Sequence, residues 1–224
     1  MLPSKKFIVL NLKAFESTYG FPGTNLCRIA KEVGNSYGVR IIVCPNPLIL
    51  YNAVETGAEI FAQHVDPNKP GQFTGSINAK MLAVAGVKGS MLNHSEKRIN
   101  PEHIKNAIDS LKENELESLL CVQNTSEALK YATFKPDYIA IEPPELIGTG
   151  ISVSRAKPEV ITSTISALKE VDKQIKIVCG AGISNAEDVK KAIELGVDGV
   201  LLASAFVNAT NHRKFLESLI AVLD

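Results

Sequence analysis

The sequence predicts an α/β fold with a parallel β-sheet. The number of predicted strands favours a sheet that closes into a (β/α)8 barrel, as a single domain spanning residues 1–224. Two observations predict it: eight short apolar runs recur along the chain, and helix-like segments with charged faces separate them. Most runs are continuously apolar, as in strands that helices cover on both faces. An open, doubly wound sheet fits the same alternation, and 224 residues is short for a barrel of typically about 250.

Each strand is predicted from one apolar run. In chain order the runs span residues 6–13, 39–45, 58–65, 89–95, 117–124, 137–144, 174–183 and 198–206. Pro101 and Pro158 stand where a helix would begin, because the first helical residue needs no N–H partner. Ser184 and Glu187 have the spacing of a capping box for a helix that would end before Gly196.

Composition excludes several classes of protein. The 24 Lys and Arg residues balance the 24 Asp and Glu residues, so no excess charge indicates nucleic acid or a membrane surface as a partner. The apolar run near the N-terminus is too short for a secretory signal or a membrane span, and no later run is long enough. The four cysteines form no CxxC motif, so we expect free, buried thiols and a cytoplasmic location.

Polar residues gather where the predicted strands end. The carboxyl ends of parallel strands meet at one rim, where active sites lie, so residues far apart in the chain would converge there. These residues are Asn11, Lys13, Asn93, His94, Glu142, Gly180, Ala181, Gly182, Ala203 and Ser204. Each alone could be merely the first polar residue after a strand, but together they indicate a site.

Glu142 ends the sixth run, and two prolines follow it at once, with Gly148 and Gly150 shortly beyond. A carboxylate at the mouth of an apolar barrel is partly desolvated, which raises its pKa and makes it a usable base. A segment that is stiff first and pliable later suits a lid that moves as a unit. A rigid turn with a solvated glutamate is the alternative.

His94 and Lys13 are the other candidate catalytic residues. His94 follows the fourth run, and Ser95 is placed to cap the next turn, whose helix dipole would keep the imidazole neutral. Asn11 and Lys13 would project from one side of an extended strand, and an ammonium there can stabilise negative charge. The alternatives are a structural histidine and a solvated lysine. No histidine pair has the spacing of metal ligands.

Two turns are predicted to bind an anion. Residues 179–184 bend before a capped helix, where exposed amides and the helix dipole favour a negative charge. Asn185 occupies the third glycine position of GxGxxG, so this is no dinucleotide fingerprint. A second turn, at 201–206, strengthens the phosphate interpretation, because barrels bind phosphate in the loops after strands 7 and 8. Glycines that merely ease a tight turn are the alternative.

These motifs resemble the triosephosphate isomerase family, in the compact form typical of archaea, over essentially the whole chain. The resemblance rests on Asn-x-Lys at 11–13, AQHV at 62–65, GQFTG at 71–75, NHSEKR at 93–98, IEPPELIGTG at 141–150, CGAGIS at 179–184 and LLAS at 201–204. It implies a TIM barrel that interconverts dihydroxyacetone phosphate and glyceraldehyde 3-phosphate in glycolysis and gluconeogenesis, without a metal or other cofactor.

The resemblance also implies roles for single residues. Glu142 corresponds to the base that moves a proton between two substrate carbons, His94 to the neutral group that polarises the carbonyl, and Lys13 to the cation facing the enediolate and the phosphate. Asn11 would help to shape the pocket, Glu96 would pair with Lys13, and Ser95 would contact the base when the lid is open. The lid would span 143–150, with the amides of Ile147 and Gly148 closing over the substrate. The phosphate would be held by amides around Gly182, Ala203 and Ser204.

Four positions differ from the longer members of that family. Glu145 replaces a lid tryptophan, Cys179 replaces a tyrosine that latches the lid, and Ala203 with Ser204 replaces two glycines. These changes concern the fastening of the lid and leave the base, the electrophile and the lysine unaffected. The resemblance also implies a homodimer or homotetramer, because the loop that carries GQFTG reaches into a neighbouring subunit in the family.

Two other functions remain open at this point. One is another phosphate-binding barrel enzyme, although the metal ligands of an epimerase and the strand lysine of an aldolase are not evident. The other is a sugar-phosphate-binding barrel without catalysis, against which the presence of Glu142, His94 and Lys13 argues.

Overall fold

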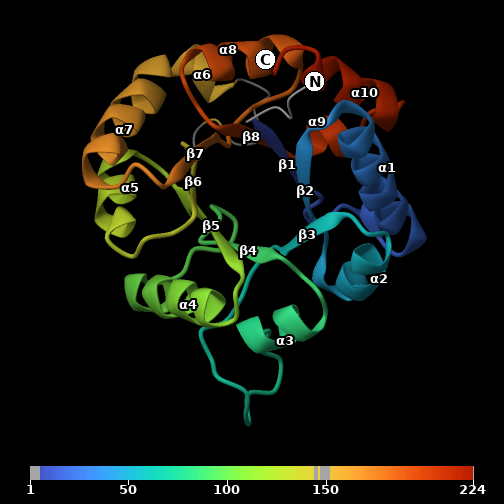
Figure 1. Ribbon diagram of the computed structural model, residues 1–224, viewed down its shortest axis with the longest axis vertical. Coiled ribbons are helices and arrows are strands. Elements are labelled where there is room, and N and C mark those ends of the chain that lie inside the picture. The colour runs from blue at the N-terminus through green and yellow to red at the C-terminus, as the bar shows by residue number, and fades with distance from the viewer. Residues whose placement is uncertain (1–5, 144–145, 147–151, 224) are drawn as a thin grey trace.

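The computed structural model describes residues 6–143, 146 and 152–223. Eight parallel strands close into a barrel in sequence order, so that β1 pairs with both β2 and β8 (Figure 1). The strands are β1 (Phe7–Asn11), β2 (Arg40–Cys44), β3 (Glu59–Ala62), β4 (Gly89–Leu92), β5 (Glu117–Val122), β6 (Tyr138–Ile141), β7 (Lys176–Cys179) and β8 (Gly199–Leu202). The closed ring confirms the predicted barrel and excludes the open sheet.

Helices surround the ring and connect successive strands (Figure 1). They are α1 (Phe21–Tyr37), α2 (Leu50–Glu55), α3 (Ala79–Val84), α4 (Pro101–Glu113), α5 (Thr125–Ala132), α6 (Val153–Ala156), α7 (Pro158–Val171), α8 (Ala186–Glu194), α9 (Ser204–Val207) and α10 (His212–Ile220), with short 3-10 turns at η1 (Glu16–Thr18) and η2 (Pro47–Ile49). Pro101 and Pro158 begin α4 and α7, as predicted.

The cap of α8 differs from the predicted capping box by one residue. Asn185, not Ser184, is the N-cap, and its side chain accepts the N–H of Asp188 at 3.0 Å. The carboxylate that reaches back belongs to Asp188 and accepts the N–H of Ser184 at 3.0 Å. Glu187 instead forms an ion pair with Arg155. Asparagine is as good an N-cap as serine, so the spacing alone could not separate the two registers.

Two layers of apolar side chains hold the barrel together. One face of each strand packs against the helices, and the other face fills the barrel interior, because successive side chains of a strand point to opposite sides. Twelve described residues form the inner cluster: Phe7, Val9, Ile42, Cys44, Phe61, Met91, Leu119, Cys121, Tyr138, Ala140, Val178 and Leu201. The interior is therefore a packed core, as the barrel architecture requires.

The amino ends of the strands carry a cluster of charged and aromatic side chains. Arg40, the first residue of β2, pairs with Glu59 and Glu117 and donates to the hydroxyl of Tyr138. The Tyr138 hydroxyl donates to Glu117 at 2.9 Å. The Arg40 guanidinium also lies 5.6 Å from the centre of the Tyr138 ring and 6.0 Å from that of Phe7, within the range of cation–π attraction. This cluster forms the floor of the barrel.

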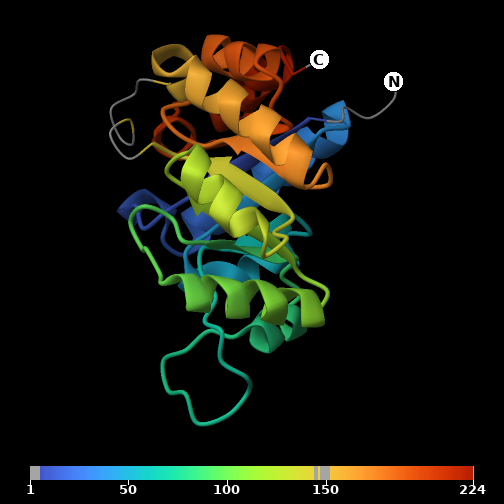
Figure 2. The same cartoon turned by 90° about the vertical axis from the view of Figure 1, so that its left-hand side faces the viewer.

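The segment from residue 66 to residue 78, between β3 and α3, projects from one end of the molecule (Figure 2). Its two ends are joined, because Asp66 N–H donates to the carbonyl of Ile77 at 2.7 Å and Ile77 N–H donates to the Asp66 carboxylate at 2.8 Å. His64 lies 3.0 Å from the same carboxylate. The GQFTG motif at 71–75 therefore lies away from the barrel, in a loop whose two ends are held together by hydrogen bonds.

The four cysteines are buried free thiols, as the sequence predicted. None of the helices in the described part of the chain is both long and apolar enough to cross a membrane.

Candidate active site

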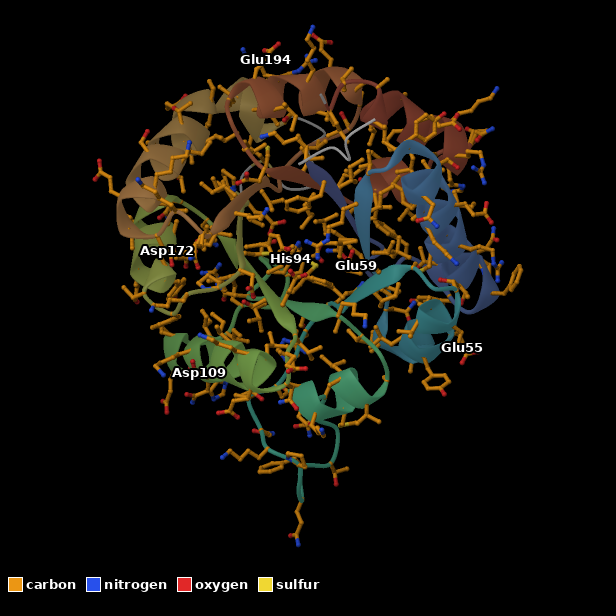
Figure 3. The ribbon with its side chains drawn as sticks, viewed as in Figure 1. Glu55, Glu59, His94, Asp109, Asp172 and Glu194 are labelled. Atoms are coloured by element: carbon orange, nitrogen blue, oxygen red, sulfur yellow. The ribbon has the colours of Figure 1, made fainter. Side chains whose placement is uncertain are left out.

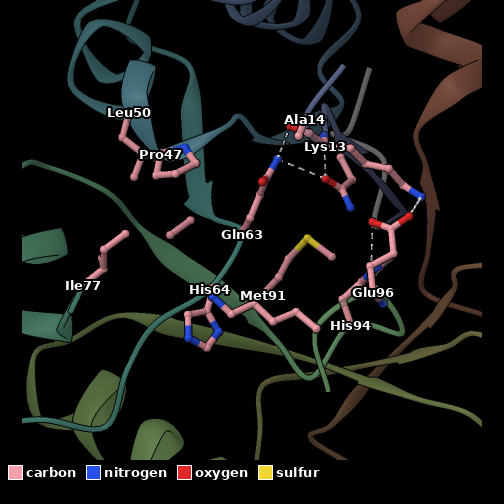
Figure 4. A pocket seen from close by; sticks show the side chains of 13 residues that line it. Lys13, Ala14, Pro47, Leu50, Gln63, His64, Ile77, Met91, His94 and Glu96 are labelled. Carbon is pink, nitrogen blue, oxygen red and sulfur yellow. Dashed lines mark hydrogen bonds and ion pairs between the residues drawn. The ribbon is translucent and has the colours of Figure 1, made fainter. Parts of the chain in front are cut away.

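A cavity of about 300 Å³ lies at the carboxyl ends of the strands. Its lining includes six of the predicted site residues: Lys13, His94, Glu142, Gly182, Ala203 and Ser204. A neighbouring cavity of about 300 Å³ shares Lys13 and His94 and adds Asn11 and Glu96 (Figure 4). Ile147, Gly148 and most of the predicted lid lie outside the described residues. Strands far apart in sequence thus converge on one rim.

Glu142 follows β6 directly, and its backbone N–H donates to the carbonyl of Val122 at 2.8 Å. Its side chain is only 2% exposed. Burial raises the pKa of the carboxyl to about 7, although the Cys121 thiol and the charge of Lys13 act in the opposite direction. Among the described residues, none forms a hydrogen bond with Oε2 of Glu142. The group is therefore a carboxylate with a free oxygen and a proton affinity suited to accepting a proton near neutral pH.

Gly180 is required by the position of this base. A Cβ atom at Gly180 would lie 2.6 Å from Cγ of Glu142 and 3.0 Å from Oε1, closer than such atoms approach. We expect Gly180→Ala to displace the carboxylate and to lower kcat ~100-fold, because a shift of about 1 Å can cost that much. Steady-state kinetics measures the loss, and a melting curve close to that of the parent protein is the control. An unchanged kcat would contradict this placement of Glu142.

His94 stands in the turn after β4, near the middle of the ring of strands (Figure 3). Its Nδ1 accepts the N–H of Glu96 at 3.2 Å, so the neutral ring carries its hydrogen on Nε2. That nitrogen lies 3.6 Å from Oε1 of Glu142. Burial, assisted by the charge of Lys13 and opposed by that of Glu96, lowers the pKa of His94. The site thus contains a neutral imidazole whose Nε2–H lies near the base but beyond hydrogen-bond distance of it.

The predicted cause of this neutrality was wrong in part. The next helix, α4, begins only at Pro101 and is capped by Asn100, whose side chain accepts the N–H of His103 at 2.8 Å. The N-terminus of α4 therefore does not begin at the turn that carries His94. Ser95 does not cap a turn: within the described residues its buried hydroxyl has no hydrogen-bond partner, and this includes Glu142. Burial and a backbone N–H replace the helix in keeping the imidazole neutral.

Asn11 and Lys13 come together through a turn and not through strand alternation. Strand β1 ends at Asn11, and Lys13 has the left-handed backbone conformation, with φ of 48°. The N–H of Lys13 donates to the side chain of Asn11 at 3.0 Å. The Lys13 ammonium lies 2.7 Å from the Glu96 carboxylate (Figure 4). The turn aims the ammonium across the cavity, toward the loop that carries His94.

Gln63 is a site residue that sequence reasoning missed. Its amide nitrogen donates to the side chain of Asn11 at 3.3 Å, to the carbonyl of Lys13 at 3.0 Å and to the carbonyl of Cys44 at 3.0 Å (Figure 4). It therefore fixes the turn that presents Lys13. The signal was available, because Gln63 is the first residue after β3 and a polar residue follows several other strands in the same way.

The two glycine- and alanine-rich turns lie in the same cavity as Lys13. Gly182, in the turn after β7, has φ of 70°, which glycine adopts without strain. Ala203 lies between the end of β8 and the first residue of α9. Backbone amides at such turns can bind a phosphate. Among the described residues, no group of three or more His, Cys, Asp or Glu side chains is placed to hold a metal ion.

Comparison with known proteins agrees with this geometry. The family model of triosephosphate isomerase matches residues 6–220. The triosephosphate isomerase of Methanothermus fervidus is 44% identical over 217 residues, which cover 96% of this chain and 98% of the relative. That of Methanocaldococcus jannaschii is also 44% identical, over 95% of this chain and 98% of its own. The enzyme of Methanobrevibacter smithii is 42% identical over 96% and 98%. The resemblance noted in the sequence is thereby confirmed, and the chain belongs to the triosephosphate isomerase family.

Proposed function

We propose that this chain interconverts dihydroxyacetone phosphate and D-glyceraldehyde 3-phosphate, with Glu142, His94 and Lys13 as its catalytic residues. The observation that carries the proposal is the distance of 3.6 Å between the buried carboxylate of Glu142 and Nε2 of His94. Lys13 lines the same cavity. A base, a neutral donor and a cation around one small cavity fit the abstraction of a proton beside a carbonyl group.

In the proposed mechanism Glu142 removes a proton from the carbon next to the carbonyl and returns it to the neighbouring carbon. The Nε2–H group of His94 donates to the substrate oxygens, where negative charge develops in the enediolate, and relays the hydroxyl proton of the substrate to the former carbonyl oxygen. The ammonium of Lys13 stabilises the same charge and attracts the phosphate. The raised pKa of Glu142, about 7, matches the two steps, because the group must take up a proton and then release it.

The amides around Gly182, Ala203 and Ser204 are proposed to hold the phosphate, since both turns line the cavity beside Glu142. Asn11 would shape the pocket, and Glu96 would hold Lys13 through their ion pair. Ser95 would contact the base when the lid is open. The lid at 143–150 would close over the substrate with the amides of Ile147 and Gly148, which excludes water from the reactive enediolate.

A coupled assay with glyceraldehyde 3-phosphate tests the proposal. We expect the purified chain to form dihydroxyacetone phosphate and to keep its rate in the presence of a metal chelator. An aldolase or a metal-dependent epimerase would fail this assay. Binding of a phosphoglycolate-like anion without any turnover would instead identify a sugar-phosphate-binding barrel and would refute the proposed activity.

The pH dependence of kcat/KM should reveal the buried base. Because the pKa of Glu142 is raised to about 7, kcat/KM should fall about tenfold per pH unit below pH 7 and level off above it. The pKa of His94 is lowered by burial, so its own titration is shifted to the acid side of that of a free imidazole. The inhibition constant of inorganic sulfate, which does not titrate here, is the control for phosphate-site integrity. An acid limb that begins near pH 4.5 would contradict the assignment.

We further propose that the chain forms a homodimer or a homotetramer through the projecting segment 66–78. Exposed apolar side chains support a subunit contact: Phe73 lies in the segment, Met81 and Val84 in α3, and Leu48 and Tyr51 in η2 and α2. A role in glycolysis and gluconeogenesis follows from the proposed reaction. Free, buried thiols fit a cytoplasmic location. Sedimentation of the purified chain would show whether it is an oligomer.

A further inference from the structure

A buried carboxylate joins two separate segments at the rim of the barrel. The side chain of Asp188, in the first turn of α8, is only 3% exposed. One of its oxygens accepts both the N–H and the hydroxyl of Ser184, at 3.0 and 2.8 Å. The other lies 2.7 Å from Nε of Arg155 in α6. Ser184 belongs to the turn that lines the cavity with Glu142. Asp188 therefore connects that turn to α6.

Side chains buried beside Asp188 make the same connection a second time. The hydroxyl of Ser154 donates to the backbone carbonyl of Asp188 at 3.2 Å and lies 2.7 Å from the hydroxyl of Ser152. The thiol of Cys179, at the end of β7, interacts with the backbone N–H groups of Ser154 and Ala181. Burial nevertheless raises the pKa of this thiol to about 12, so it stays protonated. Residues 152–155 are thus fixed to the turn at several points.

Helix capping does not account for these contacts. The cap of α8 needs only Asn185 and the bonds between Asp188 and Ser184. The contacts with Arg155 and Ser154 reach across to another element. A buried carboxylate is costly unless it is paired and hydrogen-bonded, so the full set of partners fixes the relative position of the two segments closely.

We propose that Asp188 is a positioning residue for substrate phosphate: it holds the turn at 180–184 against residues 152–155, so that the amides of the turn meet the phosphate in the correct geometry. This inference rests on the proposed function. Asp188 does not line the cavity with Glu142 and acts through Ser184 and the turn.

The test compares a substrate that has a phosphate with one that lacks it. For Asp188→Asn, which keeps the shape and removes the charge, we expect KM for glyceraldehyde 3-phosphate and the inhibition constant of inorganic phosphate to rise at least ~10-fold, the effect of losing one good interaction. The kcat/KM for D-glyceraldehyde, which has no phosphate to misplace, should stay within about twofold. A merely structural role would lower kcat/KM for both substrates alike.

Two further variants keep the test decisive. Arg155→Met removes a half-exposed partner of Asp188 and should raise the same two constants in the same direction, even if Asp188→Asn does not fold. Asn211→Ala removes the cap of α10, whose side chain accepts the N–H of Lys214, and should lower only the melting temperature. The proposal is overturned if Asp188→Asn or Arg155→Met leaves both constants unchanged, or if both substrates lose rate equally. A parent protein inactive on triose phosphate would instead refute the proposed function.

Discussion

Replacing Glu142 by glutamine should lower kcat at least ~1000-fold, because a positioned general base contributes about 10²–10⁴. The amide keeps the shape of the side chain but cannot accept the substrate proton. Glu142 is buried, and a Cβ atom at Gly180 would lie 2.6 Å from its Cγ, so the position of the base is tightly constrained. KM should change much less than kcat, because the phosphate turns are untouched. The coupled assay under single-turnover conditions measures the chemical step directly.

The same variant should be more stable than the parent at high pH. The pKa of Glu142 is about 7 in the folded chain and 4.5 for the free group, so the folded state binds the proton more tightly. This carboxyl therefore destabilises the fold increasingly as the pH rises from 4.5 to 7. Glutamine removes the effect, which amounts to at most about 3 kcal/mol above pH 7. Urea unfolding at pH 5 and pH 8 measures it, and full activity of Glu142→Gln would refute the assignment of the base.

Replacing His94 by asparagine should lower kcat ~100- to 1000-fold, the usual cost of removing one donor to a developing oxyanion. The side-chain oxygen of asparagine can take the place of Nδ1 and accept the N–H of Glu96, which keeps the turn. The shorter side chain does not reach the position of Nε2, which lies 3.6 Å from Glu142. The variant therefore separates the donor from the structural role of the ring.

The acid limb of the pH profile is the control for this variant. It should remain near pH 7 in His94→Asn, because burial of Glu142 is the main cause of its raised pKa. A small loss of kcat, below about tenfold, would show that Nε2–H does not polarise the substrate. A limb that disappears with the imidazole would assign the titration to His94 instead.

The sequence favoured the barrel over an open sheet and predicted the convergence of the site residues. Uninterrupted apolar runs specify strands that are covered on both faces, and the polar residues after them must lie at one rim. Glu142, His94 and Lys13 could therefore be placed together although nearly 130 positions separate the first from the last. This inference needs only the order of the strands and their common direction, which are properties of the fold and not of any single contact.

Finer features depended on geometry that the sequence does not specify. Ser184 and Asn185 are both good N-caps, and only the backbone decides between them. The left-handed turn at Lys13 is an uncommon conformation for a lysine. The pairing of Arg155 with Asp188 joins residues 33 positions apart and depends on the docking of α6. Local patterns therefore predicted the elements, while contacts between elements required the structure.

The packed side chains at the strand starts close that end of the barrel, so the active-site cavity is reached from the carboxyl ends of the strands. Arg40, Tyr138 and their partners occupy the strand starts, and the inner cluster fills the space between them and Glu142. We therefore expect a hydrogen held by Glu142 to exchange with bulk water from the side of the cavity and not through the packed strand starts. The rate at which an isotopic label abstracted from the substrate is lost to water would then depend on solvent access through the cavity. Substitutions at Arg40 would change the melting temperature but not the fraction of label retained in the product.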